Sequence, residues 1–251
     1  MQKRLYFSRI RMVLSPWCHT GYVKSRRFYS FYLVFLLLAG SVFSGHAIAR
    51  QTAVAEKRAV GSADTKVLIV YLSRTRNTKA IAELIQQQTQ GELVSIETQV
   101  PYPENYQATV DQVSRENKAG FLPKLKTQIN NIAQYDVIFL GFPTWGMQMP
   151  PPMKSFIKQY GLSGKTVIPF NTNAGYGVGS GFDDVQRYCS GCTVLPGLQL
   201  KGGKERDGIL FVMEGQRAIE AKAQLSQWLI KLGKDNALLN SVLSRQQLQA
   251  Q

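Results

Sequence analysis

The sequence predicts a doubly wound α/β domain on a five-stranded parallel sheet, and three features of the chain support this fold class. Short apolar segments alternate with stretches whose apolar residues recur at helical spacing. Residues 67–72 and 137–142 are apolar at successive positions, as strands covered on both faces must be. Polar or glycine-rich loops follow the strands, at the edge where such sheets bind their ligands. The chain therefore predicts ligand-binding turns at one edge of a parallel sheet.

The elements follow one another in regular alternation. We expect strands at residues 66–72, 92–97, 136–142, 165–171 and 193–200. We expect helices at residues 77–88, 105–118, 153–160, 182–188 and 214–232. The domain then spans residues 66–233, after a polar linker at 50–65. Residues 234–251 have helical composition, and they either pack on the domain or recruit a partner.

Residues 1–49 have the composition of an export signal. They contain seven Lys or Arg and no acidic residue, followed by an apolar run at 28–45 and small residues at Ala47 and Ala49. This order predicts cleavage after Ala49 and a periplasmic protein, with a retained inner-membrane anchor as the alternative. Ser25-Arg26-Arg27 before the apolar run resembles a twin-arginine signal, although paired arginines also begin general secretory signals.

Composition excludes several kinds of chemistry. Both histidines, His19 and His46, lie in the signal, so the mature chain has no Ser/His/Asp triad, no Cys/His pair and no histidine-ligated metal site. Removing the signal halves the net charge of +14 to about +7. No basic tract remains, which argues against nucleic-acid recognition and only weakly for anionic partners or the membrane surface. Reactivity must come from a bound cofactor, carboxylates, Tyr, Lys or the two remaining cysteines.

The loop after the first strand, Ser73-Arg-Thr-Arg-Asn-Thr78, leads into a helix. Free N–H groups at a helix N-terminus bind anions, and four polar side chains add donors there. The loop therefore predicts a phosphate site built without a metal. Ordinary capping of the helix by Asn77 or Thr75 is the alternative.

Two further loops supply flat and flexible surfaces. Trp145 stands among prolines after the third strand, which suits stacking on a planar ligand, or else makes it a core or lid residue. Residues 171–181 contain four glycines, so that backbone can approach a ligand closely, and Tyr176 offers a second aromatic face. A flexible surface loop is the alternative. Together the three loops would enclose a planar ring system that carries one phosphate.

Residues 66–233 resemble the flavodoxin-like proteins, whose first loop typically reads S/T-x-T-G-N-T and holds the phosphate of FMN. Residues 101–106, 141–146 and 163–172 also resemble a subgroup of that family. The resemblance implies strand order 2-1-3-4-5 and FMN as cofactor. It carries over as phosphate contacts Ser73, Thr75, Asn77 and Thr78, with Arg76 beside them as a further candidate. As the border of the isoalloxazine ring it carries over Pro143, Thr144, Trp145, Gly146, Asn173, Ala174, Gly175, Tyr176 and Gly177.

Arg76 stands where the family has Gly. It either donates charge-assisted bonds to the phosphate or, if the position needs a positive φ, strains the loop by about 1 to 2 kcal/mol.

Cys189 and Cys192 form a C-x-x-C pair in an exported chain. Such a pair is either a redox dithiol, a local disulfide or two buried thiols. Because the pair closes a predicted helix rather than opening one, we expect a structural role.

These observations predict an FMN-binding oxidoreductase that passes electrons or hydride from a donor to a quinone, another small molecule or a redox protein. No protein nucleophile is needed. The candidate walls of a substrate pocket are Tyr102, Tyr106, Trp145 and Tyr176. A flavodoxin-type electron shuttle is the first alternative, although such carriers tend to be acidic, and a binding module that has lost FMN is the second.

Overall fold

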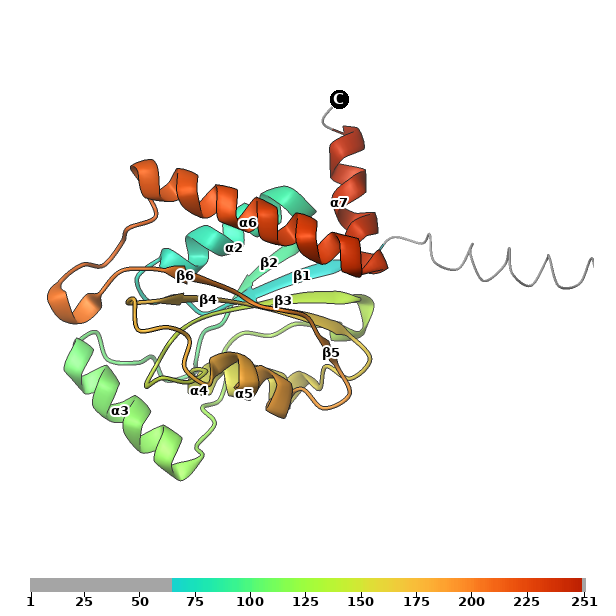
Figure 1. Ribbon diagram of the computed structural model, residues 1–251. Coiled ribbons are helices and arrows are strands. Elements are labelled where there is room, and N and C mark those ends of the chain that lie inside the picture. The colour runs from blue at the N-terminus through green and yellow to red at the C-terminus, as the bar shows by residue number, and fades with distance from the viewer. Residues whose placement is uncertain (1–64, 250–251) are drawn as a thin grey trace, which may run out of the picture. The chain divides into compact units, whose positions relative to one another are not determined.

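The structure is a computed structural model that describes residues 65–249, and its centre is a parallel sheet (Figure 1). The strands lie in the order β2-β1-β3-β4-β5, which confirms the predicted doubly wound fold. Each of the first four predicted strands is present, with ends shifted by one or two residues. The strands are β1 Val67–Tyr71, β2 Glu92–Ser95, β3 Val137–Pro143, β4 Thr166–Asn173, β5 Thr193–Val194 and β6 Leu198–Lys201.

The predicted fifth strand is divided into two pieces, β5 and β6, which both pair with β4 in parallel. Pro196 lies between the pieces and has no N–H to give to the sheet. Gly197 lies against Phe182, since a Cβ at Gly197 would stand 2.6 Å from the Phe182 ring. The backbone therefore leaves the sheet at residues 196–197 and rejoins it further along β4.

Helices cover both faces of the sheet, with α2 and α6 on one face and α4 and α5 on the other (Figure 1). Each face has its own apolar core, one against α2 and α6 and one against α4. The helices are α2 Asn77–Thr89, α3 Tyr106–Ala119, α4 Pro151–Tyr160, α5 Gly181–Tyr188, α6 Gly215–Asp235 and α7 Ala237–Gln249, with short 3-10 turns η2 Ile132–Gln134 and η3 Glu205–Asp207. No helix within residues 65–249 is long and apolar enough to cross a membrane.

The C-terminal segment packs on the domain. Leu239 and Val242 of α7 are buried in the same core as α2 and α6. Gly233 lets the two last helices approach, since a Cβ there would stand 3.2 Å from Leu243. Of the two roles left open for residues 234–251, the structure shows packing.

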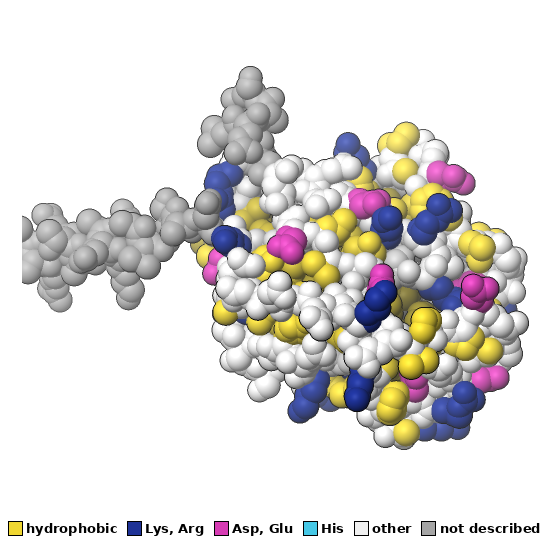
Figure 2. Space-filling model, turned by 180° about the vertical axis from the view of Figure 1, so that it is seen from behind, with side chains coloured by type: hydrophobic (Ala, Val, Ile, Leu, Met, Phe, Trp, Pro, Cys, Tyr) yellow, Lys and Arg dark blue, Asp and Glu magenta, His cyan; other side chains and the backbone are white. Residues whose placement is uncertain are grey.

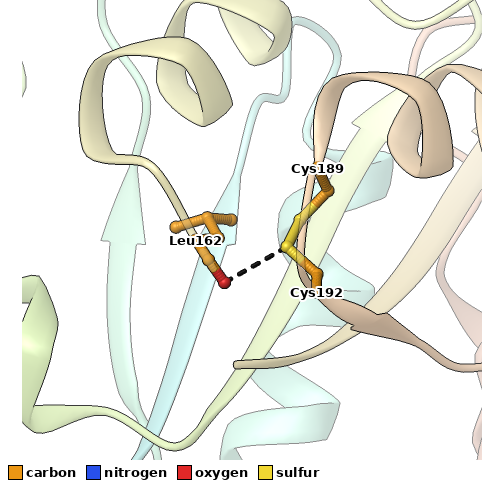
Figure 3. The surroundings of a disulfide bond; sticks show 3 residues. All are labelled: Leu162, Cys189 and Cys192. Atoms are coloured by element: carbon orange, nitrogen blue, oxygen red, sulfur yellow. Dashed lines mark hydrogen bonds between the residues drawn. A yellow bond between two sulfur atoms is a disulfide. The ribbon is translucent and has the colours of Figure 1, made fainter. Parts of the chain in front are cut away.

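Cys189 and Cys192 form a disulfide at the end of α5 (Figure 3). The Cys192 Sγ lies 3.1 Å from the carbonyl oxygen of Leu162, and Gly164 donates a backbone hydrogen bond to Gly191. Helix α5 starts at the end of the sheet where β4 stops and runs back to the other end. The pair is therefore a local disulfide at the edge opposite the three ligand loops, and the structural role expected for it stays a prediction.

Charges on the visible face of the molecule are mixed. Figure 2 shows basic, acidic and hydrophobic side chains interspersed there, without a continuous basic field. The predicted signal, its twin-arginine motif and most of the linker lie outside the described residues.

Candidate functional site

The loop after β1 turns sharply into α2 at Arg76. Arg76 has φ 65° and is the N-cap residue, but its own side chain makes no capping hydrogen bond. Capping by Asn77 or Thr75, the alternative from the sequence, is therefore wrong. The position needs the left-handed conformation that glycine adopts freely, so Arg76 strains the loop by about 1 to 2 kcal/mol. Its guanidinium lies 5.0 Å from the Phe211 ring centre, an attraction that offsets part of the strain.

Donors gather at this helix N-terminus. Among the described residues, none accepts a hydrogen bond from the backbone N–H of Arg76, Asn77 or Thr78. The Thr75 hydroxyl accepts from Asn77 Nδ2, and that of Ser73 accepts from the Lys79 N–H, so both O–H groups are left to donate. Three amides, two hydroxyls and the positive end of α2 form a cradle for an anion.

Asn77 is buried and ties the cradle to the segment after β6. Its Nδ2 donates to the Leu210 carbonyl at 2.6 Å, and its Oδ1 accepts from the Val212 N–H at 3.1 Å. Since the side chain is fully used inside the protein, only the Asn77 backbone N–H is free for a ligand. Thr78 is also buried, and its hydroxyl shares a hydrogen bond of 2.8 Å with Thr172 of β4.

Arg74 crosses from the first loop to two other segments. It forms an ion pair of 2.7 Å with Glu205 of η3, and it donates to the backbone carbonyl groups of Pro103 and Glu104 just before α3. It also reaches the Thr109 hydroxyl at 3.2 Å. The guanidinium thus holds α3 and η3 at the same end of the sheet as the cradle.

The loops after β3 and β4 are joined to each other. The Thr144 hydroxyl donates to the Gly177 carbonyl at 3.1 Å and accepts from Asn171 Nδ2. The Asn173 Oδ1 accepts from the N–H groups of Gly175 and Gly177.

A second link joins these loops at Gly179. A Cβ at this residue would stand 2.0 Å from the Met147 carbonyl oxygen, so only glycine fits. Beyond Met147, the Met149 N–H donates to the buried Asp184 of α5 at 3.0 Å. The two loops are therefore fixed by hydrogen bonds and close packing, rather than free at the surface.

Two cavities open between these segments. One of about 220 Å³ lies between the loops after β3 and β4 and η3; the predicted residues that line it are Thr144, Gly146, Asn173, Ala174, Tyr176 and Gly177. One of about 520 Å³ lies between α3 and the turn at Trp145. Both are lined by Tyr106, Thr144, Gly146 and Glu205, so they adjoin, and the two together are called the trough below.

The four predicted wall aromatics do not share one cavity. Tyr106 and Trp145 line the larger one, Tyr176 lines the smaller, and Tyr102 packs edge-on against Trp145 at 5.0 Å on the far side of the turn. Tyr102 donates to Glu116, and burial with this bond raises its pKa well above the usual range. Its phenol is therefore neutral and structural.

Several residues of the trough were not predicted as site residues. Arg74 lies inside the first motif, where its position between two hydroxyl residues was the available signal. Glu205, Lys204 and Arg206 come from a segment with no motif, and Asn117 lies in the last turn of an ordinary amphipathic helix. Their roles depend on contacts between distant segments.

The site fits a phosphate joined to a planar ring. The cradle at α2 supplies donors, and Glu205, the one carboxylate among the described residues that line the trough, is paired with Arg74. Trp145 and Tyr176 give aromatic surface on the two sides of the trough. Within residues 65–249 no cluster of three or more His, Cys, Asp or Glu side chains is placed to hold a metal ion.

A doubly wound sheet with an anion cradle after β1 and aromatic loops after β3 and β4 defines a mononucleotide-binding protein of the flavodoxin fold class. The sequence model of the flavodoxin family matches residues 66–215. The chain belongs to this family, whose members use FMN. A search of curated proteins finds no match to the chain.

Solved structures of flavoproteins share the fold. A protein from Bacteroides eggerthii assigned as a flavoprotein is 30% identical, with a TM-score of 0.51 over 55% of this chain and 89% of that chain. Another so assigned, from Bacteroides uniformis, is 26% identical, with a TM-score of 0.51 over 57% of this chain and 94% of that chain. A flavoprotein from Lactobacillus acidophilus, solved in complex with FMN, is 24% identical, with a TM-score of 0.48 over 58% and 99% of the two chains.

Proposed function

We propose that this protein holds FMN in the trough and works as an oxidoreductase, passing electrons or hydride from a donor to a quinone or another acceptor. The observation that carries the proposal is the cradle at α2, where three backbone N–H groups lack an acceptor among the described residues. Family membership makes the phosphate of FMN its natural ligand. Bound FMN supplies reversible electron and hydride chemistry, which the protein's own side chains lack.

In this proposal the residues of the chain bind FMN and orient its ring. Ser73 and Thr75 donate to the phosphate together with the backbone N–H groups of Arg76, Asn77 and Thr78. The loops containing Trp145 and Tyr176 border the ring and shield it from water. Because these loops are bonded to each other through Thr144 and Gly177, the border exists before any ligand binds.

An enzyme is favoured over a shuttle by the size of the trough. Beyond the 220 Å³ between the two loops, about 520 Å³ remains beside α3 for a second small molecule. The shuttle has its own support, since Met147 and Tyr176 are 49% and 61% exposed and offer apolar contact to a protein partner. Turnover of a small quinone by the purified protein distinguishes the two.

Export to the periplasm is part of the proposal. The disulfide between Cys189 and Cys192 supports it, because such bonds persist mainly in oxidising compartments. Expression of the full chain in a bacterial host, followed by fractionation and N-terminal sequencing, tests whether a product starting at Arg50 reaches the periplasm. A chain that stays uncleaved at the membrane would favour the anchor.

The cofactor is tested by the visible absorbance of the purified protein and by identification of what it releases on denaturation. We expect a yellow protein that releases one FMN per chain. Thr75→Val removes a hydroxyl donor to a charged group and should weaken FMN binding about tenfold. Thr193→Val, at an exposed position of β5, is the matched control and should leave affinity unchanged. A colourless protein that also fails to bind added FMN would favour a binding module without flavin.

A further inference from the structure

The larger cavity, between α3 and the turn after β3, is lined by both apolar and amide side chains. Val110 and Val113 of α3 and the ring of Trp145 make one part of its wall apolar. Asn117 and Gln148 place two side-chain amides in the wall as well. A ligand that fits both parts has an apolar body and a polar group.

The orientation of the two amides is set from behind by Lys154 of α4. This lysine is only 6% exposed, and its Nζ donates to Asn117 Oδ1 at 3.0 Å and to Gln148 Oε1 at 2.6 Å. An ammonium group can only donate, so both amides must turn their oxygen atoms toward it. Their NH₂ groups are thereby directed away from Lys154.

The two NH₂ groups remain free to bind a ligand. Within residues 65–249 no group accepts a hydrogen bond from Asn117 Nδ2 or Gln148 Nε2. A Cβ at Gly146, itself in the cavity wall, would stand 3.6 Å from Asn117 Nδ2, which places this donor at the cavity. The amides of Asn117 and Gln148, called the donor end of the cavity, therefore present hydrogen-bond donors to a ligand.

Lys154 makes this arrangement at a cost. Burial lowers its pKa, and among the described residues no carboxylate lies within ion-pair distance of its Nζ. Burying a cation without a close counter-ion is unfavourable for folding. What the lysine supplies in return is a fixed direction for two amides that would otherwise be free to rotate.

We propose that this cavity binds a planar, mostly apolar molecule of the quinone class, with the ring against Val113 and Trp145 and a carbonyl oxygen on the NH₂ groups of Asn117 and Gln148. Lys154 is a positioning residue that keeps both donors pointing at the ligand. The assignment of this occupant as the electron acceptor rests on the proposed function, but the binding itself does not.

The test is equilibrium dialysis of the purified full-length protein against two probes of similar shape. The probes are 2-methyl-1,4-naphthoquinone and 2-methylnaphthalene, which lacks the carbonyl groups. We expect the quinone to bind at least threefold more tightly than the hydrocarbon. Val113→Trp fills the apolar part of the cavity and should weaken both probes at least tenfold. Equal affinity of the two probes, or unchanged binding by Val113→Trp, overturns the proposal.

Variants of the donor end separate positioning from packing. Asn117→Leu with Gln148→Leu should remove the preference for the quinone and leave the hydrocarbon bound as before. Lys154→Met should do the same, because the amides can then rotate, while Lys154→Arg keeps a donor behind them and keeps most of the preference. Gln107→Leu, an exposed amide elsewhere on α3, is the matched control and should change neither probe. A preference retained in both Lys154→Met and the double variant overturns the roles given to these residues.

Two further measurements keep the outcomes separate. Thermal unfolding shows whether each variant is folded, and the released flavin is quantified for each preparation. A protein without FMN that still prefers the quinone contradicts the proposed function and leaves this inference standing. An FMN-loaded protein that shows no preference contradicts this inference alone.

Discussion

The parallel strands begin at one end of the sheet, called the amino edge here, and stop at the other end, the carboxyl edge. Polar contacts stabilise both edges, but the contacts are arranged differently. At the amino edge, Tyr135 donates to Glu92, and Lys165 donates to the Tyr135 carbonyl at 2.6 Å. The disulfide adds a covalent tie there. At the carboxyl edge, Arg74 and Lys154 connect the body of the domain to α3, and the trough lies between those two connections.

The difference shows how one fold separates stability from binding. Contacts at the amino edge join neighbouring loops directly. Contacts at the carboxyl edge connect α3 to the body of the domain and leave donors unpaired, the backbone N–H of Asn77 in the cradle and the amide of Asn117 in the wall of the larger cavity. At the amino edge the polar groups are paired with one another, whereas at the carboxyl edge some of them remain able to bind a ligand.

The largest effect on stability is expected at Asn77, where the carboxyl edge is most like a buried core. Asn77→Ala leaves the Leu210 carbonyl and the Val212 N–H without their partner. We expect a loss of about 3 kcal/mol in the free energy of unfolding, because buried polar groups that lose a partner cost about 1 to 3 kcal/mol each. Urea denaturation measures it. A loss below about 1 kcal/mol would show that the segment after β6 is not held by this side chain.

The disulfide provides the corresponding test at the amino edge. The double variant Cys189→Ala with Cys192→Ala should lose about 2 kcal/mol, since the bond closes a very short loop in the unfolded chain. FMN content should stay the same, because the bond lies at the edge opposite the cradle. Denaturation and released flavin are measured on the same samples. Loss of flavin with retained stability would connect the two edges.

Tyr135 should make the amino edge sensitive to alkaline pH. Burial and the hydrogen bond to Glu92 raise the pKa of Tyr135 to about 12, above the value of about 10 in an unfolded chain. The folded state therefore favours the neutral phenol, and this contribution is complete below pH 10 and is lost as the pH rises toward 12. Tyr135→Phe should lose about 1 kcal/mol at pH 8 and less at pH 11. The same difference at both pH values, from urea denaturation, would contradict the shift.

The smallest effect is expected at Arg76. Arg76→Gly relieves strain of about 1 to 2 kcal/mol but loses the contact with Phe211 and adds freedom to the unfolded chain. These terms nearly cancel, so the free energy of unfolding should change by less than about 1 kcal/mol. FMN affinity, measured by fluorescence titration, should change less than threefold, because the guanidinium packs on Phe211. A tenfold loss would instead assign Arg76 a direct bond to the phosphate.

Much of the fold could be read from local sequence patterns. Fully apolar strands such as Val67–Tyr71 predict a sheet covered on both faces, and helical spacing located α2 and α6 to within a few residues. The one divided strand, β5 and β6, follows from Pro196 and from contact between Gly197 and Phe182. Of these two causes, only Pro196 can be recognised in the sequence, because the contact with Phe182 depends on the fold.

The sequence by itself determined the sheet, its helices, the cradle motif after β1 and the lack of histidine in residues 50–251, because these depend on local spacing and composition. Tertiary structure decided the rest: the use of Asn77 as an internal tie, the reach of Arg74 to Glu205, and the alignment of Asn117 and Gln148 by Lys154. Each of these contacts joins side chains from different elements. Their directions follow from how the helices and loops pack, which no local pattern specifies.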